Sequence, residues 1–180
     1  MLTVAIQENE LYNERTGEFI EIHPRTIQLE HSLISVSKWE SKWKKPFFDG
    51  KPKSRSETID YYRCMTVTPN VDPVLYLGIT PETERKILDY INDPQTATTI
   101  HRQNKGHGRK ETLTSELIYY QMSALGIPFE CERWHLNRLF TLLEIAAIKG
   151  QPSNKMSKKD LYNQNRALNA ARRAKSGSRG

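Results

Sequence analysis

Thiols and imidazoles are the side chains of this 180-residue chain that come closest to a chemical motif. Cys131 and His135 are four residues apart, and the apolar spacing predicts one helix from about Glu130 to Lys149, on which both would share a face. Such a pair could begin a metal site, but a structural zinc ion needs four ligands of this kind. The other candidates are scattered: Cys64, His23, His31, His101 and His107. We therefore expect Cys131 to pack, His135 to form a hydrogen bond near the core, and no metal or cofactor to bind.

Signatures of catalysis and of phosphate binding are weak as well. The segment 105–108 (KGHG) has neither the glycine spacing of a phosphate-binding loop nor a strand before it and a helix after it. The sequence contains no Gly-x-Ser-x-Gly elbow, and no pair of acids stands in a setting that calls for acid–base work. We therefore expect a protein that is not an enzyme.

The distribution of charge is the most unusual physical feature of the chain. The net charge is +6, but residues 155–180 hold eight basic residues and one acid, which gives this segment +7 and leaves residues 1–154 at −1. A block of like charges favours an extended, partner-seeking segment. The candidate contacts are its basic residues Lys158, Lys159, Arg166, Arg172, Arg173 and Lys175.

The partner of this basic arm is left open by charge alone, which sets no partner type. There are three alternatives: the arm binds a protein, it binds a nucleic acid, or it is a solubilising tail that binds neither. Tyr162 is the arm's one aromatic residue, so stacking on bases is poorly supported and a protein partner is favoured.

Two tryptophans pose a similar choice. Trp39 and Trp43 are four residues apart and are flanked by lysines. At helical spacing they fall on one face, where packing in the core is their more common fate. A Trp-x-x-x-Trp face rimmed by lysines could also be a protein-binding surface, so both residues are candidate partner contacts.

The N-terminal thirty residues are expected to form the β-element. Leu2, Val4 and Ile6 alternate with polar residues, and extended character returns after the turn-rich segment 13–17. This pattern predicts a β-hairpin, or a three-stranded sheet if a further strand runs through Ile27 and Leu29.

Helical signals fill residues 31–150. Ser37 with Glu40 has the spacing of a capping box, Ser56-Glu57 suits a second start, and Thr80-Pro81 suits a third. A further helix is expected from about Thr114, with a glycine closing it, and the helix from about Glu130 is expected to be the central core helix. The polar, glycine-bearing segment 103–110 is expected to be a mobile surface loop.

Together these signals predict an α+β fold that is mainly α: a β-element over residues 1–30, a body of about five helices over 31–150, and a basic arm over 151–180. The arm is expected to be a marginal helix with a disordered tip, because its alanines give helix propensity but little bulk. No segment approaches the ~20 apolar residues that span a bilayer, and the N-terminus lacks the pattern of a secretory signal. An intracellular protein with free thiols and no membrane partner is expected.

Several blocks of the sequence resemble small proteins encoded in long-tailed bacteriophage genomes, usually just upstream of the tape measure protein. The blocks are Leu29–Phe47 (LEHSLISVSKWESKWKKPF), Thr96–Thr99 (TATT), Ile127–Leu139 (IPFECERWHLNRL) and Asn165–Arg173 (NRALNAARR). The resemblance is to a whole chain of this shape and not to a catalytic signature, so it carries over no functional residue one by one.

This resemblance implies a tail assembly chaperone. Such proteins have a small β-element followed by helices, and they are implied to coat the tape measure protein in the host bacterial cytoplasm before the tail tube polymerises around it. They are not expected in the finished virion. Self-association along the client is expected as well, because a β-hairpin offers free strand edges.

Two rival functions stay open beside this one. One is a structural protein of the virion, such as a connector or a tail-completion component, which would be present in purified particles. The other is a phage DNA-binding protein that uses the basic arm, whose DNA affinity would fall with salt and with deletion of residues 155–180.

Overall fold

The computed structural model describes residues 1–14, 17–100, 112–150 and 158–176. The expected loop at 103–110 and the tip of the arm at 177–180 lie outside these residues. The chain divides into two compact units, Met1–Ala146 and Ala147–Gly180, and each is described by itself. Within the described part, no helix is both long enough and apolar enough to cross a lipid bilayer.

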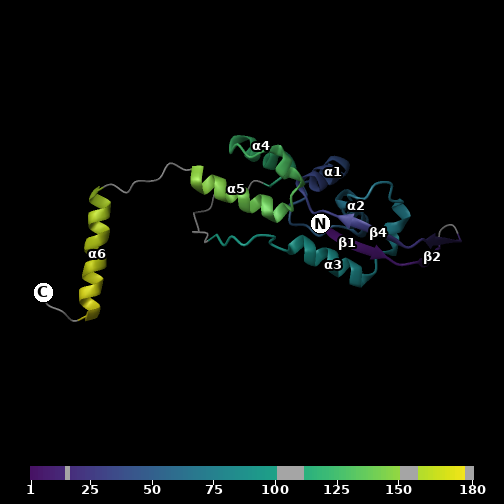
Figure 1. Ribbon diagram of the computed structural model, residues 1–180, viewed down its shortest axis with the longest axis horizontal. Helices are drawn as coiled ribbons and strands as arrows, with labels where there is room; N and C mark the ends of the chain where they lie inside the picture. Colours follow the sequence, from purple (N-terminus) through teal and green to yellow (C-terminus); the bar gives the residue numbers. More distant parts are fainter. Residues whose placement is uncertain (15–16, 101–111, 151–157, 177–180) are drawn as a thin grey trace. The chain divides into compact units, whose positions relative to one another are not determined.

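Four strands form two antiparallel pairs in the described N-terminal region (Figure 1). Strand β1 (Leu2–Ile6) pairs with β4 (Arg25–Leu29), and β2 (Asn9–Asn13) pairs with β3 (Glu18–Ile22). The residue numbers of every pair add up to 31 in both sheets, so one register runs through all four strands. The β-element is therefore one long hairpin whose two arms are each interrupted once. Two or three strands were expected from the sequence, and the number is wrong because the interruption was not visible.

Proline accounts for the interruption of the hairpin. Pro24 lies between β3 and β4 and has no N–H to donate to the ladder. Ile6 and Ile22, on the two sides of the break, are both buried and approach Gly78 from the same direction. A Cβ atom at Gly78 would lie 3.0 Å from Cδ1 of Ile22 and 3.2 Å from Cγ2 of Ile6. The absence of a side chain at Gly78 is therefore what lets both halves of the hairpin pack at this point.

The rest of the described chain is helical, which confirms the expected α+β, mainly α fold with a basic C-terminal helix. The α-helices of the first unit begin with α1 (Leu33–Trp43), α2 (Arg55–Met65), α3 (Pro81–Asn92) and α4 (Ser115–Ala124). A short 3-10 helix, η1 (Pro73–Gly78), lies between α2 and α3. A second one, η2 (Phe129–Arg133), follows α4 and precedes α5 (Leu136–Gly150). Helix α6 (Lys158–Ser176) belongs to the second unit.

Helix starts follow capping rules, although not always at the expected residues. Thr80 caps α3, as predicted, and Thr114, at which a helix was expected to begin, caps α4. In each case the hydroxyl accepts a hydrogen bond from a first-turn N–H. The other two starts were predicted wrongly. Ser32 caps α1, and Ser54 forms a capping box with Glu57 at the start of α2. The expected caps at Ser37 and Ser56 lie inside these helices, because earlier serines already serve the free N–H groups.

Glu40, expected to belong to a cap, instead joins three parts of the fold. Its side chain is buried; Oε1 accepts a hydrogen bond from the N–H of Phe47 at 2.7 Å, and Oε2 accepts one from the N–H of Ser115 at 2.8 Å. Ser115 is the first residue of α4, where unpaired N–H groups attract negative charge. One carboxylate therefore holds the loop after α1 and the start of α4 against α1.

Helix α1 is the centre of the first unit, because it packs against α2, α4 and η2. The expectation of a single core helix from about Glu130 to Lys149 is wrong. Trp134 is extended at the end of η2, His135 forms a β-bridge with Ser32, and α5 begins only at Leu136. Pairing with the segment before α1 overrides helix propensity here. The C-terminal end of α5 is exposed, with Ile148 at 55%.

Candidate functional site

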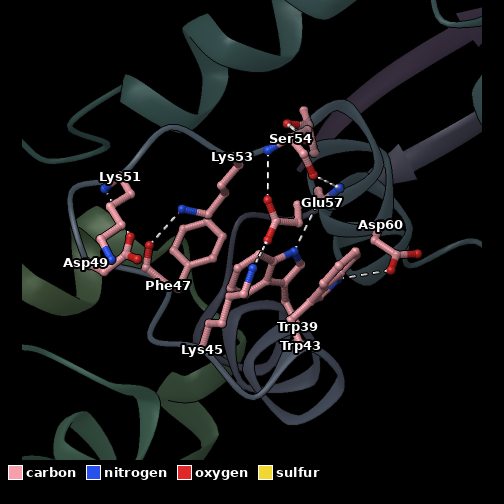
Figure 2. Close-up of polar contacts among 11 residues, drawn as sticks. Trp39, Trp43, Lys45, Phe47, Asp49, Lys51, Lys53, Ser54, Glu57 and Asp60 are labelled. Atoms are coloured by element: carbon pink, nitrogen blue, oxygen red, sulfur yellow. Dashed lines mark hydrogen bonds and ion pairs between the residues drawn. The ribbon is translucent and has the colours of Figure 1, made fainter.

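The tryptophan pair of α1 lies against α2 (Figure 2). The rings of Trp39 and Trp43 stack with 6.2 Å between their centroids. Nε1 of Trp39 donates to the backbone oxygen of Glu57 at 2.9 Å, and Nε1 of Trp43 donates to Oδ2 of Asp60 at 3.0 Å. Trp39 is only 2% exposed, so it belongs to the core, which is the first of the two fates that the sequence left open. Trp43 is half-buried and keeps part of its ring at the surface.

Lysines surround this pair, as the sequence suggested, but several already have partners. Lys45 forms an ion pair with Glu57 at 2.7 Å, and Lys42 forms one with Asp60. Lys53 donates to the backbone oxygen of Phe47 at 2.7 Å and lies 4.1 Å from the centroid of that ring (Figure 2). The lysine rim therefore works largely in fastening α1 and the loop that follows it to α2.

The carboxylate of Glu57 is held in its ionised form. Hydrogen bonds from the Lys45 ammonium group and from Ser54 lower its pKa to about 2. Glu57 caps α2 and accepts a hydrogen bond from Lys45. Its lowered pKa makes the carboxyl group a poor proton donor at neutral pH.

Two histidines form a buried cluster where the segment before α1 meets the start of α5. The rings of His31 and His135 have centroids 5.2 Å apart, and Nδ1 of His31 is hydrogen-bonded to the hydroxyl of Tyr61. Burial, and then the neighbouring His135, lower the pKa of His31 to about 3. Nε2 of His135 lies 3.0 Å from the backbone oxygen of Tyr90, which agrees with the hydrogen bond expected for His135 near the core. The cluster fastens chain segments together.

The arrangement of Cys131 and His135 on one helix, which could have begun a metal site, is not formed. Cys131 lies in η2 and is buried, whereas His135 follows an extended residue, so the two do not share a helix face. Within the described ranges, no three His, Cys, Asp or Glu side chains are grouped closely enough to hold a metal ion. The other thiol, Cys64, is half-buried, and its pKa is raised by burial and by Asp60. A raised pKa makes a thiol a weaker nucleophile at neutral pH.

A hollow of about 560 Å³ lies beside Cys64 in the first unit. Its lining includes the apolar residues Ile34, Met65 and Val67, which we call its floor. Lys38 and Arg133 also line the hollow, and both are exposed. A second hollow of about 360 Å³ adjoins it and shares the Lys38 and Cys64 side chains. We refer to these two hollows together as the basic groove. Sequence reasoning missed it, because its lining comes from separate segments that only tertiary packing brings together.

Helix α6 contains all six basic residues proposed for the arm. Lys158 and Lys159 open it, Lys175 is next to last, and Arg166, Arg172 and Arg173 have exposed side chains. Every side chain of α6 that the structure describes is exposed, including Tyr162 at 67% and Leu168 at 49%. The residues Tyr162, Arg166, Asn169 and Arg173 recur at intervals of three and four, which places them along one face of the helix.

Comparison of the chain with protein-family models, with curated proteins and with solved structures gave no match.

Proposed function

We propose that this chain is a non-enzymatic assembly chaperone of a bacteriophage tail, which binds the tape measure protein in the host cytoplasm during tail morphogenesis. The observation that carries the proposal is α6, a helix of 19 residues with six basic residues and one acid, whose described side chains are all exposed. Helices in proteins draw most of their stability from packing of an apolar face, and the described side chains of α6 are not buried. Contacts with a partner would therefore stabilise it.

The surface of α6 suits a protein client. Tyr162 and Leu168 offer exposed apolar area, and Arg166, Arg172 and Arg173 offer charged donors around it. Arginine and tyrosine are enriched among the residues that contribute most to protein–protein binding. A tape measure protein is a long helical filament, and helix-on-helix contacts with acidic positions of such a client would use both kinds of group. Many such contacts, each weak, would let tube subunits displace the chaperone.

The resemblance of the blocks around Trp39, Trp134 and Ala170 to phage tail assembly chaperones supports the same client. The structure of the first unit fits a carrier body. Its core is closed around α1, and within the described residues every buried polar side-chain atom has a hydrogen-bond partner. We therefore assign client binding to the surface of the chain, and first to the strongly charged helix α6.

Co-expression with the tape measure protein encoded next to it tests this proposal. The full chain is expected to keep that protein soluble and to co-purify with it, and deletion of residues 155–180 is expected to abolish both effects. The matched control exchanges three exposed cations of the body, Lys44→Ala, Lys51→Ala and Arg85→Ala, and is expected to bind as the intact chain does. The proposal would be overturned if the deletion variant still kept the tape measure protein soluble, or if the full chain failed to bind it.

A DNA-binding function is the second candidate, and it rests on the same basic helix. Neutralising phosphates releases counterions, so DNA affinity carried by α6 would fall steeply with salt and would vanish on deletion of residues 155–180. We expect no DNA binding at physiological salt. Presence of the protein in purified, washed particles would instead favour a structural role in the virion.

A further inference from the structure

Among the described residues of the first unit, the end of the β-hairpin carries an exposed aromatic and acidic face. Tyr12 and Phe19 are cross-strand partners, 57% and 65% exposed, with ring centroids 5.1 Å apart. The next pair on the same face, Glu10 and Glu21, sets two exposed carboxylates directly opposite each other. Like charges placed opposite each other destabilise a strand pair. We refer to these four residues as the hairpin face.

The hairpin face lacks the positive charge that would offset this repulsion. In the described part of the chain, neither Glu10 nor Glu21 has an ion pair. Residues 8–22 contain five glutamates and one arginine, so the whole end of the hairpin is acidic. Two aromatic rings beside two carboxylates form a surface that suits cationic side chains over an apolar floor.

The basic groove has the complementary composition. Each of its two hollows is lined by one acid, and both acids are already engaged: Glu30 with the N-terminal amine and with Tyr90, Asp60 with Lys42 and Arg63. Lys38 and Arg133 are exposed, and among the described residues neither has an ion-pair partner. The groove therefore presents unpaired positive charge above Ile34, Met65 and Val67.

The two surfaces lie at opposite ends of the hairpin. Met1, which lines the larger hollow, precedes β1 at the open end, whereas Tyr12 and Phe19 lie next to the closing turn. Ten residues of strand at about 3.3 Å each separate Leu2 from Tyr12, on the order of 33 Å. Ile6 and Ile22 anchor both halves of the hairpin on η1, so the hairpin cannot fold back onto its own groove.

We propose that the hairpin face of one copy docks into the basic groove of a second copy. In this contact Glu10 and Glu21 meet Lys38 and Arg133, and the Tyr12 and Phe19 rings cover the apolar floor beside Cys64. The two surfaces differ, so the contact is heterologous: each copy keeps a free hairpin face at one end and a free groove at the other. Such a contact builds an open-ended chain of copies, and it extends the proposed function by giving the chaperone a way to cover a long filament.

Sedimentation velocity of the full chain, without any client, tests this contact. The intact protein is expected to form larger species as its concentration rises, and to lose them at high salt. The hairpin variant Glu10→Lys/Glu21→Lys and the groove variant Lys38→Glu/Arg133→Glu are each expected to weaken association at least about 100-fold, because each places like charges together. Asp89→Lys/Glu116→Lys, two exposed acids on α3 and α4, makes the same change of charge and is expected to associate as the intact protein does.

Mixing the two interface variants gives the sharper test. The hairpin variant retains an intact groove and the groove variant an intact hairpin face, and the two reversed surfaces are again opposite in charge. A mixture is therefore expected to regain the association that each variant loses alone. Cys64 is expected to be protected from maleimide in the mixture and to stay reactive in each variant alone. Circular dichroism verifies that each variant is folded. If the hairpin variant is unfolded, the neutral change Glu10→Gln/Glu21→Gln takes its place.

Four results would overturn the proposed contact. These are a protein that is monomeric at all concentrations, variants that associate as the intact chain does, a mixture that does not regain association, and association that is lost only on deletion of residues 155–180. The last result would place self-association on α6. Because the tape measure protein is absent from these measurements, none of these results decides whether the chain binds that client.

Discussion

Trp39 and Trp43 lie one turn apart on α1, and both donate their indole N–H groups to α2. Their surroundings nevertheless differ, because Trp39 is 2% exposed and donates to a backbone oxygen, whereas Trp43 is half-buried and donates to the carboxylate of Asp60. The inner ring therefore contributes buried apolar surface at the centre of the fold, and the outer ring mainly closes the seam between the two helices.

We expect this difference to be visible in stability. Trp39→Ala should lower the free energy of unfolding by about 3–5 kcal/mol, the range for removing a large buried aromatic side chain. Trp43→Phe keeps a ring in the stack and loses one hydrogen bond, so it should cost about 1 kcal/mol. Urea unfolding followed by circular dichroism measures both. Equal losses would show that the two rings do not play the separate roles assigned to them.

The carboxylate of Glu40 is expected to be among the most sensitive positions of the first unit. Glu40→Ala leaves the N–H groups of Phe47 and Ser115 without their acceptor, which should cost about 3 kcal/mol or more. Glu40→Gln keeps one acceptor oxygen and should cost less. Asp89→Ala, at an exposed position of α3, serves as the control and should change the free energy of unfolding by less than about 0.5 kcal/mol. A small effect of Glu40→Ala in thermal unfolding would contradict this assignment.

The buried histidine cluster should make stability depend on pH. The pKa of His31 is about 3 in the folded chain, against an ordinary value of 6.5. Between these values the unfolded chain binds more protons than the folded one, so stability is fully present above 6.5 and is lost as the pH falls towards 3. His31→Gln should reduce the loss in urea midpoint between about pH 7.5 and about pH 5.5. His23→Gln, at an exposed position, should leave that loss unchanged.

Gly78 should tolerate no side chain without a loss of packing. Gly78→Ala pushes a methyl group against Ile6 and Ile22, and we expect it to cost about 1–3 kcal/mol, the usual range for overpacking. Gly150→Ala is the matched control, because nothing lies within 4 Å of a Cβ atom there. That change ends α5 with a better helix former and should be neutral or slightly stabilising. Equal thermal midpoints for the two variants would mean that the hairpin does not pack on η1 as described.

Local signals in the sequence predicted a good part of this fold. The alternation from Leu2 to Ile6, the capping threonine Thr80 and the helix of the basic arm depend on neighbouring residues, and the structure has them as expected. The break in the first arm of the hairpin, between Ile6 and Asn9, and the late start of α5 depend on distant partners. His135 forms a β-bridge with Ser32 and is not helical. Residue spacing within one segment cannot predict such a pairing.

The candidate surfaces divide in the same way. Charge alone indicated α6, because its basic residues lie within one short segment of the sequence. The fate of Trp39 was open, since a tryptophan beside lysines suits either a core or an interface. The basic groove brings Lys38 and Arg133 together from segments almost a hundred residues apart, so composition gave no sign of it. The hairpin face, by contrast, could be read from the pairing of Glu10 with Glu21 once the register is known.

The affinity of the full chain for a phage tape measure protein, measured by titration with and without three arginines of α6, tests the central claim most directly. Arg166→Ala/Arg172→Ala/Arg173→Ala removes three exposed cations and leaves the alanine-rich helix intact. The proposed function predicts tight binding by the intact chain and a loss of at least about tenfold in this variant, with weaker binding at high salt. Equal affinity of the two proteins, or no binding by either, would contradict it.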